Sequence, residues 1–414
     1  MGNSLDTGLH KRPPVVVLAE PYWYNGHFET QMQLFLSEIL PMGFKVIVLC
    51  PDPRGVKAWV SKALPEYSAR VHTGTYSLLD QEGRRALSRG RGWRHLSRAV
   101  ARAQEQTGWP VDLVFITGAD ALVNHSFHSS CRRKAFKYPW VGLVFLPEYF
   151  RHRAHPLKRT AQWLNHKKIN GMASCRGIAV LDEGVYPAMT RVFSKKKVVV
   201  FPDVTDERLP GGPLPDLAVI REEAGERTVI GLIGGLYRRK GLISFLKGMK
   251  ALGSEKTYFL VAGHFPRDNY TQAQLEEIHE MTASFKAGDG RFIFEYIEDP
   301  VVFNAYVAAC DVLFLAYEGF YHSSGLLTKA AVLEKLVIVS KGYLMGERVE
   351  AFKMGLTVTE GRVSEIVEAM RTLSDPLKRE SLLRAARFKD YREKNNLQQL
   401  RGALKDLLGI EREG

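Results

Sequence analysis

The chain has 414 residues, a length that suggests two or three domains. Its 45% hydrophobic and 25% charged residues exclude global disorder, and no apolar run reaches the 18 residues that a membrane-spanning helix needs. The net charge of +13 is concentrated in residues 1–200, where 29 Lys and Arg face 14 Asp and Glu. We therefore expect the N-terminal half to face something anionic; the alternative is a basic surface kept for solubility.

Short apolar runs alternate with amphipathic segments along the first half of the chain. Val15–Ala19 is β-branched and continuous, as in a buried parallel strand. A helix is predicted over residues 28–40 and a second strand over Lys45–Cys50, which completes a strand–helix–strand crossover. Further strands are predicted at Leu113–Thr117, Trp140–Leu146, Gly177–Leu181 and Lys197–Phe201.

A basic amphipathic helix is predicted near residues 92–106. One face carries arginines and another carries apolar residues. The arginines are Arg91, Arg94, Arg98 and Arg102, and the apolar residues are Trp93, Leu96, Val100 and Ala103. Such a helix either lies on an anionic membrane surface, with Trp93 at the interface, or packs its apolar face inward. Nucleic acid is not an expected partner, because the chain shows no recognisable nucleic-acid-reading motif.

The second half repeats the alternation after a Pro- and Gly-rich stretch, Pro210–Pro215, which is predicted to be a linker. Its strands are predicted at Thr228–Ile233, Thr257–Ala262, Arg291–Tyr296, Val312–Ala316 and Leu336–Ser340. The chain end is predicted to be helical, with Asp375 as a cap before Pro376, and with Leu397, Leu400, Leu404 and Leu408 on one face. The expected domains are residues 1–207 and 208–385, with helices over 386–414 that pack back on the first domain.

The four cysteines lie far apart and form no CxxC pair. They are Cys50, Cys131, Cys175 and Cys310. This spacing predicts neither a disulfide framework nor a zinc site. We expect free thiols in a reducing cytoplasmic compartment, with peripheral attachment to the inner face of a membrane as a further option.

Two segments of the second half suit an anionic ligand. Gly234 and Gly235 follow a predicted strand and precede Arg238, Arg239 and Lys240, so amides and cations would meet a pyrophosphate. An ordinary strand–helix turn is the alternative.

The second such segment is Ser323-Ser324-Gly325, which opens a predicted helix and offers hydroxyls and free amides in the same way. Plain serine capping is the alternative there. Lys329 lies one turn later and either reaches phosphate or is solvated.

Candidate residues of the first half follow its strands, where ligands bind in open parallel sheets. Gly26 would let a phosphate approach the backbone, and His27 and Glu29 open the helix behind it. Glu148 follows the strand near residue 146 and is a candidate to stabilise a cationic transition state. A structural histidine and a surface carboxylate are the alternatives for His27 and Glu148. His125 and His128 lack a third ligand, so no metal site is expected.

These motifs, taken in order, resemble the GT-B glycosyltransferases, and the large retaining family four in particular. The resemblance covers roughly residues 14–410. The matching segments are Asn25–Glu29, Val198–Asp206, Ile230–Leu242, Ala308–Phe320 and Ser323–Ala331. The turn arginine of the family falls at Gly235, so Arg238 or Arg239 would supply that charge. The second glutamate of the family's pair falls at or beside Lys329.

The resemblance implies an α/β fold of two Rossmann-like domains that face a central cleft, with the last helices crossing back to the first. It also implies a metal-independent, retaining transferase that takes a nucleotide-diphosphate sugar, foremost a UDP-sugar, and a glycan or lipid-linked acceptor. The implied catalytic residues are His27, Glu148, Arg239 and Lys240. The implied donor-binding residues are Gly26, Gly234, Gly235, Arg238, Arg239, Lys240, His264, Ile297, Glu318, Ser323, Ser324, Gly325 and Lys329.

Two other classes remain open at this point. One is a GT-B-fold enzyme that epimerises a nucleotide sugar without an acceptor, and the other is a non-catalytic relative that only binds the sugar nucleotide. Consumption of the donor without an acceptor would identify the first, and binding without turnover would identify the second. The residues name neither the sugar, the base nor the acceptor.

Overall fold

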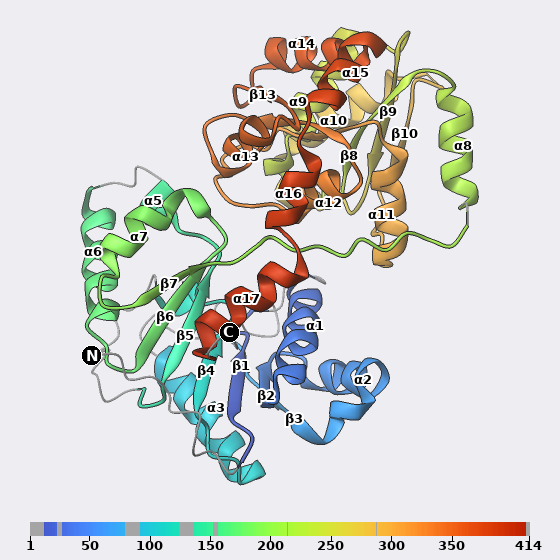
Figure 1. Ribbon diagram of the computed structural model, residues 1–414. Coiled ribbons are helices and arrows are strands. Elements are labelled where there is room, and N and C mark those ends of the chain that lie inside the picture. The colour runs from blue at the N-terminus through green and yellow to red at the C-terminus, as the bar shows by residue number, and fades with distance from the viewer. Residues whose placement is uncertain are drawn as a thin grey trace. The chain divides into compact units, whose positions relative to one another are not determined.

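The computed structural model describes residues 12–22, 27–78, 92–123, 136–151, 156–212, 214–286 and 288–410. The chain forms two compact units. Unit 1 comprises residues 1–202 and 398–414, and unit 2 comprises residues 203–397. Each unit is a parallel sheet covered by helices (Figure 1).

The described part of unit 1 contains a seven-stranded parallel sheet in the order β3-β2-β1-β4-β5-β6-β7. Chain order reverses between β1 and β4, and ligands of open α/β sheets bind at such switch points. The strands are β1 Val15–Ala19, β2 Lys45–Cys50, β3 Val71–Thr75, β4 Leu113–Ile116, β5 Trp140–Val144, β6 Cys175–Val180 and β7 Lys197–Val200. The helices are α1 His27–Ile39, α2 Pro53–Ala63, α3 Gly92–Thr107, α4 Asp120–Val123, α5 Glu148–Arg151, α6 Pro156–Asn170, α7 Tyr186–Val192 and α17 Leu397–Leu408.

Helix α3 packs its apolar face into the core of unit 1. Trp93 is 2% exposed, and its ring centroid lies 5.0 Å from that of Trp140. Leu96 and Val100 are fully buried beside it. The expectation that Trp93 sits at a membrane interface is therefore wrong, because the sheet already covers this face. Arg94, Arg98 and Arg102 are exposed, and Arg91 lies outside the described residues.

The last helix, α17, packs within unit 1. Leu400 and Leu404 are buried, and Arg401 Nε donates to Glu38 Oε2 on α1 at 2.8 Å. Leu397 is 47% exposed, so it does not share the buried face expected for it.

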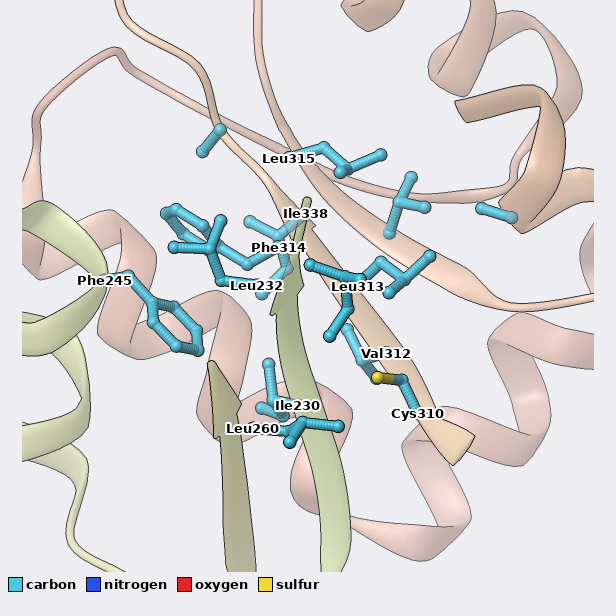
Figure 2. Close-up of a cluster of buried hydrophobic side chains, with 14 of the residues drawn as sticks. Ile230, Leu232, Phe245, Leu260, Cys310, Val312, Leu313, Phe314, Leu315 and Ile338 are labelled. Carbon is cyan, nitrogen blue, oxygen red and sulfur yellow. The ribbon is translucent and has the colours of Figure 1, made fainter. Parts of the chain in front are cut away.

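Unit 2 is built on a six-stranded parallel sheet in the order β10-β9-β8-β11-β12-β13, with the reversal between β8 and β11. The strands are β8 Thr228–Ile233, β9 Thr257–Ala262, β10 Gly290–Ile293, β11 Val312–Leu315, β12 Leu336–Ser340 and β13 Gly355–Val358. The helices are α8 Pro215–Ala224, α9 Leu242–Leu252, α10 Gln272–Ala283, α11 Pro300–Ala309, α12 Gly325–Val332, α13 Leu344–Phe352, α14 Val363–Ser374, α15 Pro376–Ala385 and α16 Phe388–Lys394. Figure 2 shows the core between β8, β9, β11 and α9. The ring centroids of Phe245 and Phe314 in this core are 4.8 Å apart.

The expected end of β5 is shortened by hydrogen bonds to a side chain on α4. Strand β5 ends at Val144 because the Phe145 and Leu146 amides donate to the Asp120 carboxylate at 2.8 and 2.9 Å. The edge strands β3 and β13 were not predicted, since most of their residues are half-buried and carry no apolar run.

The thiols of Cys50, Cys175 and Cys310 are buried and free, and Cys131 lies outside the described residues. No helix in the described residues is long and apolar enough to span a bilayer.

Candidate active site

The turns after β8 and β9 meet at the carboxyl edge of the unit 2 sheet. Gly263 has a φ of +140°, and a Cβ there would lie 2.0 Å from the Gly234 carbonyl oxygen. Only glycine permits this approach. The Gly234 amide donates to the Ala262 carbonyl at 2.8 Å, which fixes the glycine turn predicted from the sequence.

The basic turn Arg238–Lys240 is fixed against the loop that follows β11. The Glu318 amide donates to the Arg239 carbonyl at 2.8 Å, and Ser244 Oγ donates to Glu318 Oε1 at 2.8 Å. Gly241 closes the turn at a φ of +76°, where a Cβ would lie 2.8 Å from the Ala316 carbonyl oxygen. Glu318 therefore serves as a brace between the two segments.

The three cations of this turn differ in depth. Lys240 is half-buried, with its Nζ 3.7 Å from the centroid of the Tyr317 ring. Burial, and then the charge of Arg239, lower the pKa of Lys240 well below its ordinary value. Arg239 is exposed with its guanidinium 4.8 Å from the Phe320 ring, and Arg238 is exposed. An anion bound at this turn would contact Lys240 on its more buried side and the two arginines on its solvent side.

Tyr317 lies in the loop that runs from β11 to the serine loop, and its ring contacts Lys240. Its main-chain carbonyl accepts a hydrogen bond from Ser340 Oγ at 2.6 Å. Burial raises the pKa of the Tyr317 phenol to about 12, and Ser324 partly opposes that shift. The loop after β11 therefore contacts the basic turn at Tyr317 and Glu318 and then leads into the serine loop.

The serine loop opens α12 without plain serine capping. Ser324 occupies the N-cap position, yet its hydroxyl makes no capping hydrogen bond. A Cβ on Gly325 would meet no heavy atom within 4 Å, so the space beside the first turn of α12 is open. The amides at this helix start can approach a ligand.

A buried ion pair beneath the serine loop was missed by sequence reasoning. Arg348 Nη1 donates to Ser323 Oγ at 2.7 Å and to Asp203 Oδ2 at 3.2 Å, and Ser323 also donates to Asp203. Arg348 is 3% exposed, and its guanidinium also lies 3.4 Å from the Tyr391 hydroxyl. No local pattern could have indicated this pair, because its members lie 145 residues apart.

The remaining candidates of unit 2 have other surroundings. Lys329 Nζ donates to the Asp206 carbonyl at 2.9 Å and to Asn304 Oδ1 at 2.6 Å, and burial lowers its pKa to about 8. His264 has an exposed side chain and accepts the Leu236 amide at its carbonyl. Ile297 packs against the unit 2 core.

The carboxyl edge of the unit 1 sheet carries buried carboxyl groups. Glu20 follows β1, is 1% exposed, and accepts hydrogen bonds from Thr117 Oγ1 at 2.6 Å and the Tyr22 amide at 2.9 Å. Burial raises the pKa of Glu20 to about 8 and that of Asp120 to about 6. Glu148 begins α5, is half-buried, and contributes to the raised pKa of Asp120.

The expected residues at the start of α1 are only partly described. Gly26 lies outside the described residues, as does the side chain of His27, which begins α1. Sequence reasoning selected Glu148 at this edge and missed Glu20 and Asp120. Glu20 follows β1 and Asp120 follows β4, and this position at the switch point of the sheet could have indicated both residues. Within the described ranges, no three or more His, Cys, Asp or Glu side chains form a metal-binding group.

No protein-family profile and no curated protein matches the sequence. Solved structures match along almost the whole chain. Sucrose-phosphate synthase from Thermosynechococcus elongatus aligns with a TM-score of 0.67 and 17% identity, over 96% of this chain and 98% of that one. HepE from Anabaena, in complex with UDP and glucose, aligns with a TM-score of 0.64 and 13% identity, over 96% and 100%.

A UDP-forming α,α-trehalose-phosphate synthase from Burkholderia vietnamiensis aligns with a TM-score of 0.66 and 12% identity, over 96% and 100%. These similar structures and the two parallel-sheet units confirm the fold that the sequence motifs predicted. The chain has the GT-B glycosyltransferase fold.

Proposed function

We propose that the protein is a glycosyltransferase that moves a sugar from a nucleotide-diphosphate sugar, foremost a UDP-sugar, to a hydroxyl-bearing acceptor. Similar structures include one in complex with UDP and glucose and one named as UDP-forming, which supports this donor class. The acceptor class that we propose is a glycan or a lipid-linked glycan, and the donor binds to unit 2.

One observation carries the proposal: the loop after β11 contacts the basic turn at Tyr317 and Glu318 and then leads into the serine loop at the start of α12. Lys240 contacts the ring of Tyr317, and the Glu318 amide donates to the Arg239 carbonyl, so the basic turn lies against the loop that leads to the serine loop at the β8–β11 switch point. A diphosphate placed there would receive charge from Lys240 and Arg239 and hydrogen bonds from the amides at the start of α12.

These groups would act on the departing diphosphate. Negative charge develops on the leaving oxygen as the bond from the sugar to the phosphate breaks, and fixed donors lower the free energy of that charge. Lys240 and Arg239 supply this stabilisation from the protein itself, so the reaction needs no metal for it. His27 and Glu148 of unit 1 are proposed to act on the sugar side, with retention of anomeric configuration.

Thermal-shift measurements against UDP-, GDP-, ADP- and dTDP-sugars test the donor class. A ligand at 100 times its Kd stabilises the protein by roughly 2.7 kcal/mol, which shifts Tm measurably. We expect the UDP-sugars to give the largest shift. A panel of glycan and lipid-linked acceptors then tests transfer.

Two results would contradict glycosyl transfer. A new nucleotide sugar formed without an acceptor would identify an epimerase. Tight binding with no turnover on any acceptor would identify a non-catalytic sugar-nucleotide-binding protein.

A further inference from the structure

Helix α6 of unit 1 buries three polar side chains beside Ile169 and exposes a leucine and a tryptophan. Gln162, Asn165 and His166 are 5%, 2% and 4% exposed. Leu157 is 76% exposed and Trp163 is 38% exposed on the opposite side. A surface helix that packs on a core normally shows the reverse arrangement. Packing among the described residues of unit 1 therefore does not explain the exposure of Leu157 and Trp163.

The inward face of α6 carries a neutral histidine. The His166 ring stacks on Phe150 at 5.5 Å and lies edge-on to Tyr149 at 5.0 Å. Burial lowers the pKa of His166 to about 4, so the imidazole is uncharged at neutral pH and packs as an aromatic group. This packing fixes which face of α6 points to solvent.

Positive charge surrounds the exposed face. Residues 149–181 contain seven Lys and Arg and no Asp or Glu. Arg159, Lys167 and Lys168 of α6 are exposed, and Lys167 Nζ lies 4.4 Å from the Trp163 ring. Figure 1 shows α6 beside α7, on the outside of the unit 1 sheet. Two exposed apolar side chains with cations near them suit a surface that is apolar below an anionic layer.

We propose that this face of α6 binds the surface of an anionic lipid bilayer. Trp163 and Leu157 would enter the boundary between headgroups and acyl chains, and the three cations would face lipid phosphates. Helix α3 has as many exposed arginines, but its tryptophan is buried, so it offers charge without an insertable side chain. The proposal is independent of the donor chemistry of unit 2.

Vesicle co-sedimentation tests the proposal. We expect the full chain to sediment with phosphatidylcholine vesicles that contain phosphatidylglycerol, to bind pure phosphatidylcholine weakly, and to be released by high salt. The triple variant Arg159→Gln, Lys167→Gln, Lys168→Gln should lower the partition coefficient by about fivefold per cation, roughly 100-fold together. The matched control Arg94→Gln, Arg98→Gln, Arg102→Gln removes the same charge from α3 and should lower it far less.

Insertion of Trp163 into the bilayer can be measured separately, by tryptophan fluorescence. Lipids brominated in the acyl chain should quench tryptophan emission of the wild type, and Trp163→Phe should lose most of that quenching while it still sediments. Leu157→Ser should weaken sedimentation. All these residues are exposed, so the variants should keep the wild-type Tm and the wild-type thermal shift with a UDP-sugar.

Three results would overturn the proposal. The first is equal binding to neutral and anionic vesicles, and the second is an equal loss in the α6 and α3 variants. The third is no sedimentation with anionic vesicles at all, which would leave an acidic protein surface as the occupant of this face. A lost UDP-sugar shift in the wild type would instead concern the proposed function alone.

Discussion

Both sheets are parallel and each has one reversal of strand order, but the side chains at the two reversals differ in charge. In unit 2, the residues after β8 and β11 are a glycine turn and Tyr317, with Lys240 against the ring. In unit 1, the residues after β1 and β4 are Glu20 and Thr117, joined by a hydrogen bond. Each unit therefore has a switch point of the kind at which open α/β sheets bind ligands, and the side chains after the strands give the two switch points different charges.

The difference predicts a division of labour between the units. Cations and open amides in unit 2 favour an anion such as a diphosphate. A carboxyl group with a pKa of about 8 is mostly protonated at pH 7, so Glu20 in unit 1 is a buried and mostly neutral group. We therefore expect the diphosphate of the proposed donor at the unit 2 edge rather than at the unit 1 edge.

The largest expected effect comes from the ion pair beneath the serine loop. Arg348→Met leaves Asp203 buried without its cation, and loss of one partner of a buried pair costs about 3–5 kcal/mol. Denaturant unfolding should show this loss, and the affinity for a UDP-sugar should fall with it. Arg371→Met, in an exposed pair with Glu368, is the control and should cost no more than about 1 kcal/mol. Equal losses in the two variants would show that the pair does not brace the loop.

Lys240→Ala tests whether the unit 2 edge acts on the leaving diphosphate. A charge-assisted hydrogen bond contributes roughly 1.5–3 kcal/mol, so kcat/KM should fall about 10- to 200-fold. The control is Lys247→Ala, which removes an exposed lysine of α9 that pairs with Glu277. A folded Lys240→Ala variant with an unchanged rate would exclude Lys240 from the site.

The pH dependence of stability tests the unit 1 edge. The pKa of Glu20 is raised from 4.5 to about 8, so the folded chain holds this proton more tightly than the unfolded chain. Its contribution to the free energy of unfolding is full below pH 4.5 and is lost as the pH rises to 8, by up to about 1.4 kcal/mol per pH unit.

Glu20→Gln should flatten this part of the profile, measured by denaturant unfolding at several pH values. Glu29→Gln, at an exposed position of α1, should keep the wild-type slope. If the slope persists in Glu20→Gln, other groups account for it.

The smallest effect on the free protein is expected from Gly325→Val. The added side chain enters open space, so Tm should change little, while phosphate can no longer approach the α12 amides. Calorimetric titration with a UDP-sugar should show weaker binding. Gly402→Val on α17, also beside open space, should leave that affinity unchanged. Retained affinity in Gly325→Val would mean that the serine loop does not contact phosphate.

The local sequence determined the elements whose burial is continuous along the chain. Val15–Ala19, Lys45–Cys50, Thr228–Ile233 and Leu336–Ser340 form strands with the predicted bounds, because β-branched runs fit a strand covered on both faces. Asp375 caps α15 as predicted, by accepting the Leu377 and Lys378 amides. Capping and strand formation involve near neighbours in sequence, so their signals are local.

Tertiary structure alone decided the features that depend on distant neighbours. Arg348 meets Asp203 across 145 residues, and Glu20 owes its raised pKa chiefly to burial at the sheet edge. Helices α3 and α6 are both rich in basic residues, yet α3 buries its tryptophan and α6 exposes its own. Periodicity shows that a helix has two faces, whereas the surface that packs against it determines which face water reaches.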